Sequence, residues 1–368
     1  MKIAVLTSSR ADYGIYLPLL KALQADPFFD LRLIVFGTHL SSFHGYTKDA
    51  IVADGFVIDH EAEHILAADS ESAIVTSMGL VTLKFAGIWE KSKAYDLVFC
   101  LGDRYEMFAA VAAGVPFGIR FAHLHGGETT LGAIDNVFRH SISLFSQLHF
   151  TSTEIYAERV AQITGSRKNI YAVGALSLDS LDNMQLLSDA EFLQAFNIDL
   201  GKPTILVTFH PGTIKVSLNE DHARELTQSL LAFTGHQIVI TMPNADTMGN
   251  ALRRIYQEFQ AQRPGVFLVE NFGTLGYFTC MKGCDILVGN SSSGIIEAAS
   301  FGKYVVNIGD RQQGRAASDN IIHCEPDKRS ISEACAKALK AGNYSGTNIY
   351  HKPHVARSII EILKKTEW

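Results

Sequence analysis

The sequence lacks the features that mark several large classes of protein. Its five cysteines are an odd number, and Cys280 and Cys284 have no second pair at zinc-ribbon spacing, so we expect reduced, packed cysteines. The formal net charge of −6 argues against a nucleic-acid-binding surface, which needs a basic face. We find no apolar signal segment and no run of about 18 uncharged apolar residues. We therefore expect a cytoplasmic protein that binds neither nucleic acid nor membrane.

Two nucleotide-binding fingerprints are also missing. No G-x-G-x-x-G follows the first predicted strand, and no P-loop lysine motif is present. Dinucleotide oxidoreductase and NTPase functions lose most of their support, and we expect no redox cofactor. Anionic small ligands remain compatible with the composition, because a few arginines and helix N-termini are enough to bind them.

What the sequence does contain is a regular alternation of apolar strands and helical patterns. This alternation predicts α/β architecture with parallel, doubly wound sheets. A helix is predicted from about Ile15 to Ala25, with Pro18 in its first turn. The predicted strands are Ile3–Leu6, Leu31–Phe36, Phe56–Ile58, Leu97–Leu101, Pro116–Phe121, His149–Thr151, Ile170–Val173, Thr204–Phe209, Gln237–Met242, Val266–Val269, Ile286–Val288 and Tyr304–Ile308.

The length of 368 residues and a break in this rhythm predict two domains. The polar segment Gly174–Lys202 interrupts the alternation, which then restarts. We therefore predict a Rossmann-like domain at 1–173, a second one at 174–352, and a last helix at 353–368 that crosses back to the first. The expected architecture is two doubly wound domains facing across a cleft.

The densest group of reactive side chains lies in Phe121–His140, between a predicted strand and a predicted helix. Ligands of α/β sheets bind outside the carboxyl ends of strands, where this loop falls. The alternative is a polar connection whose histidines only satisfy backbone groups. Because acidic, basic and imidazole groups occur together, we favour a functional site. The candidate residues are His123, His125, Glu128, Asp135, Arg139 and His140.

A second group of polar turns ends the strands of the second predicted sheet. Ser291, Ser292, Ser293 and Gly294 follow one strand and begin a helix, where free N–H groups favour an anion. The alternative is a simple serine helix cap. Other turns at the same edge supply His210, Asn244, Arg311 and Arg315, so positive charge from His210 and the arginines would lie beside the serines. Together these turns predict diphosphate recognition, with Glu297 available to a ribose or sugar diol.

In the first domain, Arg10, Asp103, Arg104 and Glu106 would join the Phe121–His140 group at one sheet edge. Gathered carboxylates and histidines suit proton transfer at carbon, with one group as base and another as acid. Neighbouring carboxylates should also raise at least one pKa. The alternative is that Asp103 and Arg104 only pair and cap a helix. A metal pair His123-x-His125 lacks a complete ligand set, so we predict no metal.

Taken together, these residues resemble the UDP-N-acetylglucosamine 2-epimerases, specifically their hydrolysing branch. The motifs follow the family's order over nearly the whole chain; singly they are weak, but together they are highly specific. They are the segments 9–14 (SRADYG), 102–104 (GDR), 125–128 (HGGE), 135 with 139–140, 210–211 (HP), 243–246 (PNAD), 290–294 (NSSSG) with 297, and 309–312 (GDRQ).

The resemblance implies a GT-B-type pair of Rossmann domains, with UDP held mainly by the second. It implies that the C2 proton of the sugar is removed with loss of UDP, giving a 2-acetamidoglucal, and that water then adds to give N-acetylmannosamine for sialic-acid synthesis. No metal or cofactor is implied. By this resemblance, the residues at catalytic positions are Asp103, Glu128, Asp135, His125, Arg139 and His210. Those at UDP or substrate positions are Arg10, Gly14, Arg104, His210, Asn244, Phe278, Ser291, Ser292, Ser293, Gly294, Glu297 and Arg311.

One position departs from the family pattern. Non-hydrolysing relatives, and some hydrolysing ones, carry a glutamate where this chain has His125. Either His125 or neighbouring Glu128 takes that proton-transfer role, so the assignment of base and acid stays open.

Three other functions stay open beside this one. Close relatives act on UDP-N,N′-diacetylbacillosamine in legionaminic-acid pathways, with the same chemistry on a different sugar. A GT-B glycosyltransferase would release UDP only when an acceptor is present, and a nucleotide-sugar sensor would bind without turnover. The family, together with apolar helices predicted at Ser70–Lys93 and Tyr105–Ala113, favours a homodimer or homotetramer.

Overall fold

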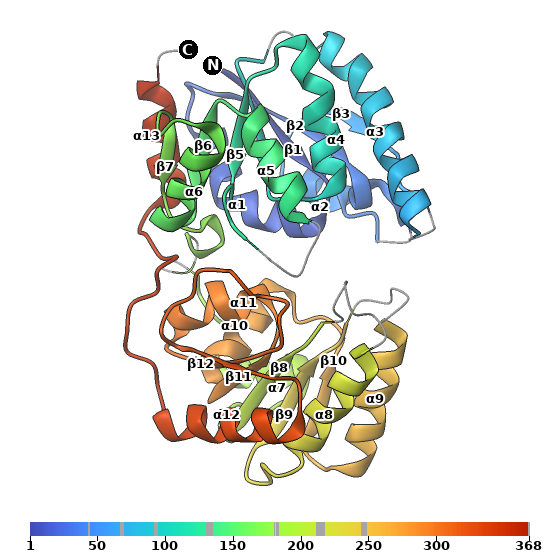
Figure 1. The fold of residues 1–368 in the computed structure, drawn as a ribbon, viewed down its shortest axis with the longest axis vertical. Helices are drawn as coiled ribbons and strands as arrows, with labels where there is room; N and C mark the ends of the chain where they lie inside the picture. Colours follow the sequence, from blue (N-terminus) through green and yellow to red (C-terminus); the bar gives the residue numbers. More distant parts are fainter. Residues whose placement is uncertain are drawn as a thin grey trace. The chain divides into compact units, whose positions relative to one another are not determined.

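Two parallel sheets form the framework of the chain in a computed structural model (Figure 1). The structure describes residues 1–42, 45–66, 70–91, 95–129, 135–179, 181, 184–210, 218–243 and 249–366. The chain divides into two compact units. The N-terminal unit comprises Met1–Glu128, Ile134–Asp182 and Tyr350–Trp368, and the C-terminal unit comprises Thr129–Ala133 and Asn183–Ile349.

The N-terminal unit has a seven-stranded sheet in the order β3-β2-β1-β4-β5-β6-β7. Its strands are buried on both faces: Ile3 and Val5 of β1 pack in one core cluster, whereas Ala4 and Leu6 pack in another. Its elements are β1 Lys2–Thr7, α1 Arg10–Ala25, β2 Asp30–Phe36, η1 Gly37–Leu40, α2 Lys48–Ala53, β3 Ile58–Ala62, α3 Glu71–Lys91, β4 Leu97–Leu101, α4 Tyr105–Gly114, η3 Val115–Phe117, β5 Phe121–Leu124, α5 Asp135–Phe145, β6 Leu148–Thr151, α6 Glu154–Thr164, β7 Ile170–Ala172, η4 Leu176–Leu178 and α13 Val355–Lys365.

The C-terminal unit repeats the design with a six-stranded sheet in the order β10-β9-β8-β11-β12-β13. Every strand pairing in both sheets is parallel. The predicted α/β class is thereby confirmed. The elements of this unit are α7 Asp189–Phe196, β8 Thr204–Thr208, α8 Asn219–Leu230, β9 Gln237–Thr241, α9 Gly249–Gln262, β10 Val266–Val269, α10 Gly273–Gly283, β11 Ile286–Gly289, α11 Ser292–Ile296, η7 Ala298–Phe301, β12 Tyr304–Ile308, β13 Ile321–Cys324 and α12 Lys328–Ala341.

The first helix begins earlier than the sequence predicts. The polar segment that the sequence suggests is a turn is the start of α1, because Ser9 caps the helix by accepting a hydrogen bond from the backbone N–H of Asp12. Asp12 in turn accepts from the backbone N–H and the hydroxyl of Ser8. Pro18 therefore lies inside the helix rather than in its first turn.

Three strands were misplaced or missed by the sequence pattern. The fifth is Phe121–Leu124 rather than the predicted Pro116–Phe121, which overlaps the 3-10 helix η3 at Val115–Phe117. The other two lie at sheet edges. The third strand is the mostly polar Ile58–Ala62 rather than the apolar run that begins at Phe56, and β13 was not predicted at all. Both are edge strands, β3 in one sheet and β13 in the other. An edge strand is covered less completely, so its sequence lacks the continuous apolar run on which the prediction depended.

The predicted domain boundary at Gly174 falls inside the N-terminal unit. Leu176 belongs to the core of that unit, and the backbone N–H of Ala175 donates to the carbonyl of Tyr350. Helix α13 also packs in that core through Val355, Ile359 and Leu363. Both oxygens of the Asp179 carboxylate accept from backbone N–H groups in the first turn of α13 and so cap the helix.

Candidate functional site

Each sheet reverses its strand order at one point, and the candidate residues gather there. The reversal lies between β1 and β4 in the N-terminal unit, and between β8 and β11 in the C-terminal unit. Connections diverge at such a switch point and leave a crevice at the carboxyl ends of the strands. Ser8 and Asp103 follow the first pair of strands, and His210 and Asn290 follow the second pair. Two candidate sites therefore arise, one in each unit.

The loop after β5 holds His125 in an unusual backbone conformation. Its φ of 61° is left-handed, which is uncommon for a residue with a side chain. Two hydrogen bonds hold it there, from its own N–H to the carbonyl of Phe150 at 3.0 Å and from Arg139 Nη1 to its carbonyl at 2.6 Å. Gly127 follows with φ 76°, and a Cβ there would lie 2.4 Å from the carbonyl oxygen of Tyr156. The surrounding structure fixes this loop.

His125 and Glu128 form a buried pair. The imidazole Nδ1 lies 2.7 Å from Glu128 Oε1, and the two residues are 8% and 2% exposed. Ser152, at the end of β6, donates to the same carboxylate oxygen at 2.9 Å. With the carboxylate ionised, Nδ1–H donates and Nε2 carries the free lone pair. Within the described part of the chain, Nε2 is buried and has no hydrogen-bond partner.

Arg139 links this pair to the loop after β4. Its guanidinium is buried, donates to the carboxylate of Asp103, and lies 3.8 Å from Glu128 Oε2. The fork of the guanidinium thus contacts two carboxylates and one carbonyl at once, which a lysine cannot reproduce. Four of the six predicted catalytic residues, His125, Glu128, Arg139 and Asp103, are therefore connected in one network.

His123 has a structural position. Its Nε2 lies 2.9 Å from the carbonyl of Gly102 and its Nδ1 lies 3.0 Å from the hydroxyl of Ser143, so both ring nitrogens are occupied. Burial lowers the pKa of this ring to about 3. His123 therefore stays neutral and ties β4 to α5. The two histidines of the candidate metal pair do not share a side of the strand, because His125 lies beyond the end of β5 in a left-handed turn.

Arg104 lies over buried acidic groups. It donates from Nε to Glu106, whose side chain is fully buried, while its own side chain is 43% exposed. Asp12, in the first turn of α1, is also buried. This burial raises the pKa of its carboxyl, although the nearby charge of Arg104 lowers it in part. The alternative for this loop, that Asp103 and Arg104 only pair and cap a helix, is wrong, because Arg104 pairs with Glu106, Asp103 pairs with Arg139, and Arg104 makes no side-chain cap to α4.

In the C-terminal unit, Asn290 joins three of the predicted turns. Its side-chain amide exchanges two 2.8 Å hydrogen bonds with the backbone of His210, one from the His210 N–H and one to the His210 carbonyl. Its own carbonyl accepts from Arg311 Nη1 and from Gln312 Nε2, each at 2.9 Å. The ends of β8, β11 and β12 are therefore held together, as expected for turns that end strands of one sheet.

The serine-rich turn follows directly. Gly289 has φ 144°, and a Cβ there would lie 2.0 Å from the carbonyl of Thr208, so only glycine fits. Ser291 caps α11 by accepting from the N–H of Ser293, as the alternative of a serine cap predicts. Ser292 and Ser293 are partly exposed at the helix start, whereas Gly294 packs near Val305 and Glu297 is buried one turn later.

The prediction that His210 supplies positive charge is wrong. Burial, helped by the neighbouring charge of Arg311, lowers the pKa of His210 to about 4, so the ring is neutral near pH 7. Arg311 carries the charge at this turn. His210 is able to hydrogen-bond a phosphate oxygen but adds no charge.

Other predicted residues lie on α10, α1 and α5. Phe278 is 7% exposed and contacts Phe301 and Tyr277 within the C-terminal unit. Arg10 and Gly14 lie on the exposed side of α1, and Asp135 is the first residue of α5. Asn244 lies outside the described residues. Sequence reasoning missed Ser152, although it occupies a polar turn after a strand and the same rule would have found it. Gln312 was part of the motif 309–312, but the sequence assigned it no role.

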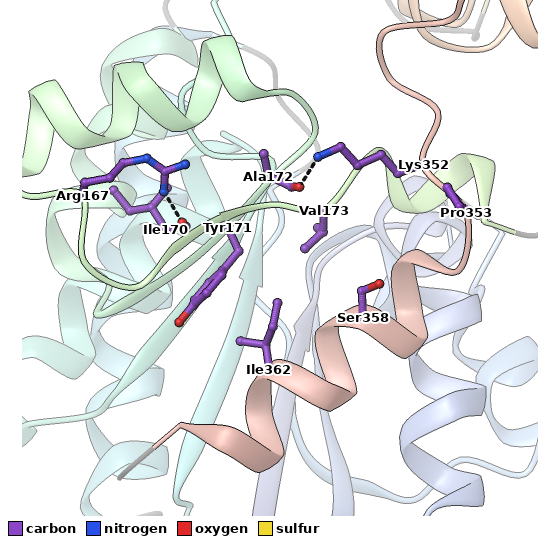
Figure 2. Close-up of a pocket in the computed structure, with 9 residues that line it drawn as sticks. All are labelled: Arg167, Ile170, Tyr171, Ala172, Val173, Lys352, Pro353, Ser358 and Ile362. Carbon is purple, nitrogen blue, oxygen red and sulfur yellow. Dashed lines mark hydrogen bonds between the residues drawn. The ribbon is translucent and has the colours of Figure 1, made fainter.

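A pocket of about 420 Å³ lies elsewhere in the N-terminal unit, between β7 and α13 (Figure 2). Lys352 Nζ donates at 2.6 Å to the carbonyl of Ala172, and Arg167 donates to the carbonyl of Ile170. These bonds satisfy carbonyls on the edge strand of the sheet. None of the described residues that line this pocket belongs to the predicted site, so it is not the catalytic candidate.

The fold and the two switch-point sites define a GT-B-like protein built from two doubly wound units. The model of the UDP-N-acetylglucosamine 2-epimerase family matches residues 21–364. The chain belongs to this family. It is similar to two curated hydrolysing enzymes, at 34% identity to the UDP-N,N′-diacetylbacillosamine 2-epimerase of Legionella pneumophila and at 35% to the GDP/UDP-N,N′-diacetylbacillosamine 2-epimerase of Campylobacter jejuni. The first alignment covers 99% of this chain and 95% of the relative, and the second covers 88% and 84%.

A solved structure agrees in fold. The crystal structure of UDP-GlcNAc 2-epimerase from Neisseria meningitidis, bound to UDP-GlcNAc, matches with a TM-score of 0.83, 18% identity and full coverage of both chains.

Proposed function

We propose that this protein is a hydrolysing UDP-sugar 2-epimerase that acts on a UDP-activated 2-acetamido sugar. The observation that carries the proposal is the linked group His125–Glu128–Arg139–Asp103 at one switch point, in a chain whose other switch point offers Arg311 and the serine turn. The first group suits proton transfer at carbon, and the second suits a diphosphate. Family membership supports joining these two tasks in one reaction.

In the first step, His125 Nε2 takes the proton from C2 of the sugar. The electron pair of that C–H bond forms the C1–C2 double bond while the C1–O bond breaks, and UDP leaves with the bonding electrons. Glu128 stabilises the resulting imidazolium through Nδ1, in the manner of a carboxylate that orients a catalytic histidine. Arg311 and the N–H groups at the start of α11 neutralise the developing charge on the diphosphate.

In the second step, water adds to the glycal. Its hydroxyl bonds to C1 and a proton is delivered to C2 on the face opposite to the one that was deprotonated, which gives the inverted free sugar. Asp103 accepts a hydrogen bond from Arg139 and positions the network, and Asp135 is our candidate for this second proton transfer. No metal or redox cofactor enters these steps.

Two sugars are candidates. The sequence motifs favour UDP-N-acetylglucosamine, which would give N-acetylmannosamine. The Legionella and Campylobacter relatives favour UDP-N,N′-diacetylbacillosamine, because both are named for it and both are hydrolysing enzymes. The chemistry at C1 and C2 is the same for both sugars.

Proton NMR in D2O with each UDP-sugar, without acceptor or added metal, tests the proposal. We expect free UDP and a C2-deuterated 2-epimeric sugar from one of the two substrates. Turnover of one identifies the sugar. UDP release only after an acceptor is added would establish a glycosyltransferase instead, and tight binding of both sugars without turnover would establish a sensor.

A further inference from the structure

Three hydroxyl residues, Thr151, Ser152 and Thr153, join β6 to α6, and their side chains have different partners. Thr151 Oγ1 donates at 3.0 Å to the carbonyl of Thr153. Thr153 caps α6, because its side chain accepts from the backbone N–H of Tyr156. The Ser152 hydroxyl instead donates at 2.9 Å to Glu128 Oε1, 24 residues earlier in the chain. The helix therefore has its cap without Ser152, whose hydroxyl serves a residue of another loop.

The same corner of the fold holds the loop that carries His125. Strands β5 and β6 are parallel neighbours, so their carboxyl ends lie at one edge of the sheet. The N–H of His125 donates at 3.0 Å to the carbonyl of Phe150. A Cβ at Gly127 would lie 2.4 Å from the carbonyl oxygen of Tyr156, so α6 covers the loop closely. These two contacts act on the backbone of the loop, whereas the hydroxyl of Ser152 acts on a carboxylate that the loop carries.

That carboxylate, of Glu128, lies between two partners that compete for it. Its Oε1 is 2.7 Å from His125 Nδ1, and its Oε2 is 3.8 Å from Arg139 Nη1. All these side chains are buried, where the attraction between a guanidinium and a carboxylate is stronger than in water. Ser152 donates to the oxygen on the imidazole side and so opposes a movement of the carboxylate toward Arg139.

The position of the carboxylate matters because it sets the tautomer of His125. A neutral imidazole carries one N–H, and the hydrogen bond that the ring makes decides which nitrogen carries it. With the carboxylate on Nδ1–H, Nε2 has a free lone pair, as a base at the sugar C2 requires. With the carboxylate turned toward Arg139, the proton would be free to move to Nε2, and that lone pair would be lost. In the Ser-His-Asp triad, a change that leaves the wrong tautomer lowers kcat about 10⁴-fold.

We propose that Ser152 is a positioning residue of the N-terminal site, which through Glu128 keeps His125 in the tautomer whose Nε2 accepts a proton. This assignment rests on the proposed function, in which that nitrogen takes the C2 proton. Arg139 on α5 and Asp103 after β4 supply the neighbouring charges, and a neutral substitution at Ser152 leaves those charges in place. The alternative is that the hydroxyl only satisfies a buried carboxylate, in which case its loss would lower stability and leave the tautomer unchanged.

The first test reads the tautomer directly, by NMR of the full-length protein isotope-labelled at its histidine nitrogens. The signal of His125 is the one lost in His125→Asn, because asparagine tolerates the left-handed backbone at this position. We expect Nδ1–H in the wild type and a mixture with Nε2–H in Ser152→Ala. Ser146→Ala, which removes a buried hydroxyl bonded to the carbonyl of Ile142, should match the wild type. Nε2–H in the wild type, or an unchanged tautomer in Ser152→Ala, would overturn the proposal.

The second test is kinetic and, unlike the first, depends on turnover. Ser152→Ala should lower kcat about tenfold and leave KM within about twofold, as expected when a hydrogen bond that acts on a proton-transfer group is lost. Ser152→Thr keeps the hydroxyl, and Ser152→Cys keeps a weaker donor of similar size, so kcat should decrease in the order wild type, Ser152→Thr, Ser152→Cys, Ser152→Ala. Stability should follow a different order, because Ser152 is fully buried and the added methyl of threonine overpacks the site.

These outcomes separate the two explanations of the Ser152 hydroxyl. A kcat that follows the unfolding midpoint across the three variants, rather than the strength of the donor, would contradict a positioning role. A wild type inert toward both UDP-sugars would refute the proposed function, while the tautomer in Ser152→Ala would still decide whether Ser152 positions His125.

Discussion

The two units share a backbone feature, a glycine required in a loop after a strand, but the side chains near it differ in chemical type. Both need a glycine in a loop that follows a strand, because a carbonyl oxygen leaves no room for a Cβ: Gly127 after β5 in the N-terminal unit and Gly289 at the end of β11 in the C-terminal unit. In the N-terminal unit the side chains that follow are carboxylates, imidazole and a buried guanidinium. In the C-terminal unit they are an amide, hydroxyls and one partly exposed arginine.

Under the proposed function, this difference assigns proton transfer to the N-terminal group and diphosphate binding to the C-terminal group. A group that moves a proton must change its charge during the reaction, so it needs partners that stabilise both forms. A group that binds a diphosphate must keep its charge and geometry fixed. Substitutions in the N-terminal network should therefore affect the rate, and substitutions in the C-terminal network should affect nucleotide affinity.

The largest effect is expected from Glu128→Gln. The amide still occupies the space beside His125 but cannot stabilise an imidazolium, so kcat should fall about 10²–10⁴-fold, as is usual for a lost acid–base contribution. The dissociation constant for UDP should change less than about twofold, because the change leaves the C-terminal unit intact. NMR turnover and calorimetric UDP titration measure the two quantities. Glu154→Gln, on the exposed surface of the same unit, is the control. A large loss of UDP affinity would refute the separation.

Stability should respond most to Arg139→Ala. The change leaves the carboxylates of Asp103 and Glu128 without their buried cation and frees the carbonyl of His125. Removing one partner of a buried ion pair costs about 3–5 kcal/mol, and the partial exposure of Asp103 places the expected loss near about 3 kcal/mol. Urea unfolding measures it. Arg357→Ala removes an exposed pair with Glu361 and should cost less than about 1 kcal/mol. Equal losses of unfolding free energy in Arg139→Ala and Arg357→Ala would mean that the contacts of Arg139 do not stabilise the fold.

The sequence predicts which residues lie at the ends of central strands better than it predicts the edge strands or the partners and protonation of buried histidines. The ends of β4 and β11 were visible as apolar runs, so Asp103 and Asn290, which follow them, were found; His125 was found because reactive side chains are dense around it. Edge strands such as β13 lack that signal. The protonation of His210 and the structural position of His123 depend on burial and on partners distant in sequence, Arg311 and the Gly102 carbonyl. No local pattern reports such contacts.

Acid should weaken the N-terminal unit more than the C-terminal unit. Burial lowers the pKa of His39, His64 and His149 to about 4 and that of His123 to about 3, whereas His210 is the one described histidine of the C-terminal unit whose pKa is lowered, to about 4. The unfolded chain, with a pKa near 6.5, binds more protons than the folded chain between these values, so stability is complete above about pH 6.5 and falls as the pH drops toward 4.

Each of these histidines should contribute about 1 kcal/mol of lost stability over the first pH unit below 6.5. Asp12 acts in the opposite sense, because the raised pKa of its carboxyl favours the folded state as the pH falls further. Hydrogen exchange at pH 7 and pH 5.5, corrected for intrinsic rates, should show a greater loss of protection in β1, β4 and β5 than in β8, β9 and β11. Equal losses in the two sheets would contradict this expectation.

The smallest effect is expected from Arg311→Ala. This variant is the counterpart of Glu128→Gln, because it should weaken UDP binding rather than lower kcat. A hydrogen bond to a charged partner contributes about 1.5–3 kcal/mol, so the dissociation constant for UDP should rise roughly 10–100-fold. The unfolding midpoint should hardly move, because Gln312 still donates to the Asn290 carbonyl and the Asn290 side chain still holds the His210 backbone. Arg254→Ala, an exposed arginine of the same unit, should leave UDP binding unchanged. If Arg311→Ala left UDP affinity intact while lowering kcat as Glu128→Gln does, both switch points would serve the chemical step, and the assignment of nucleotide binding to the C-terminal unit would be wrong.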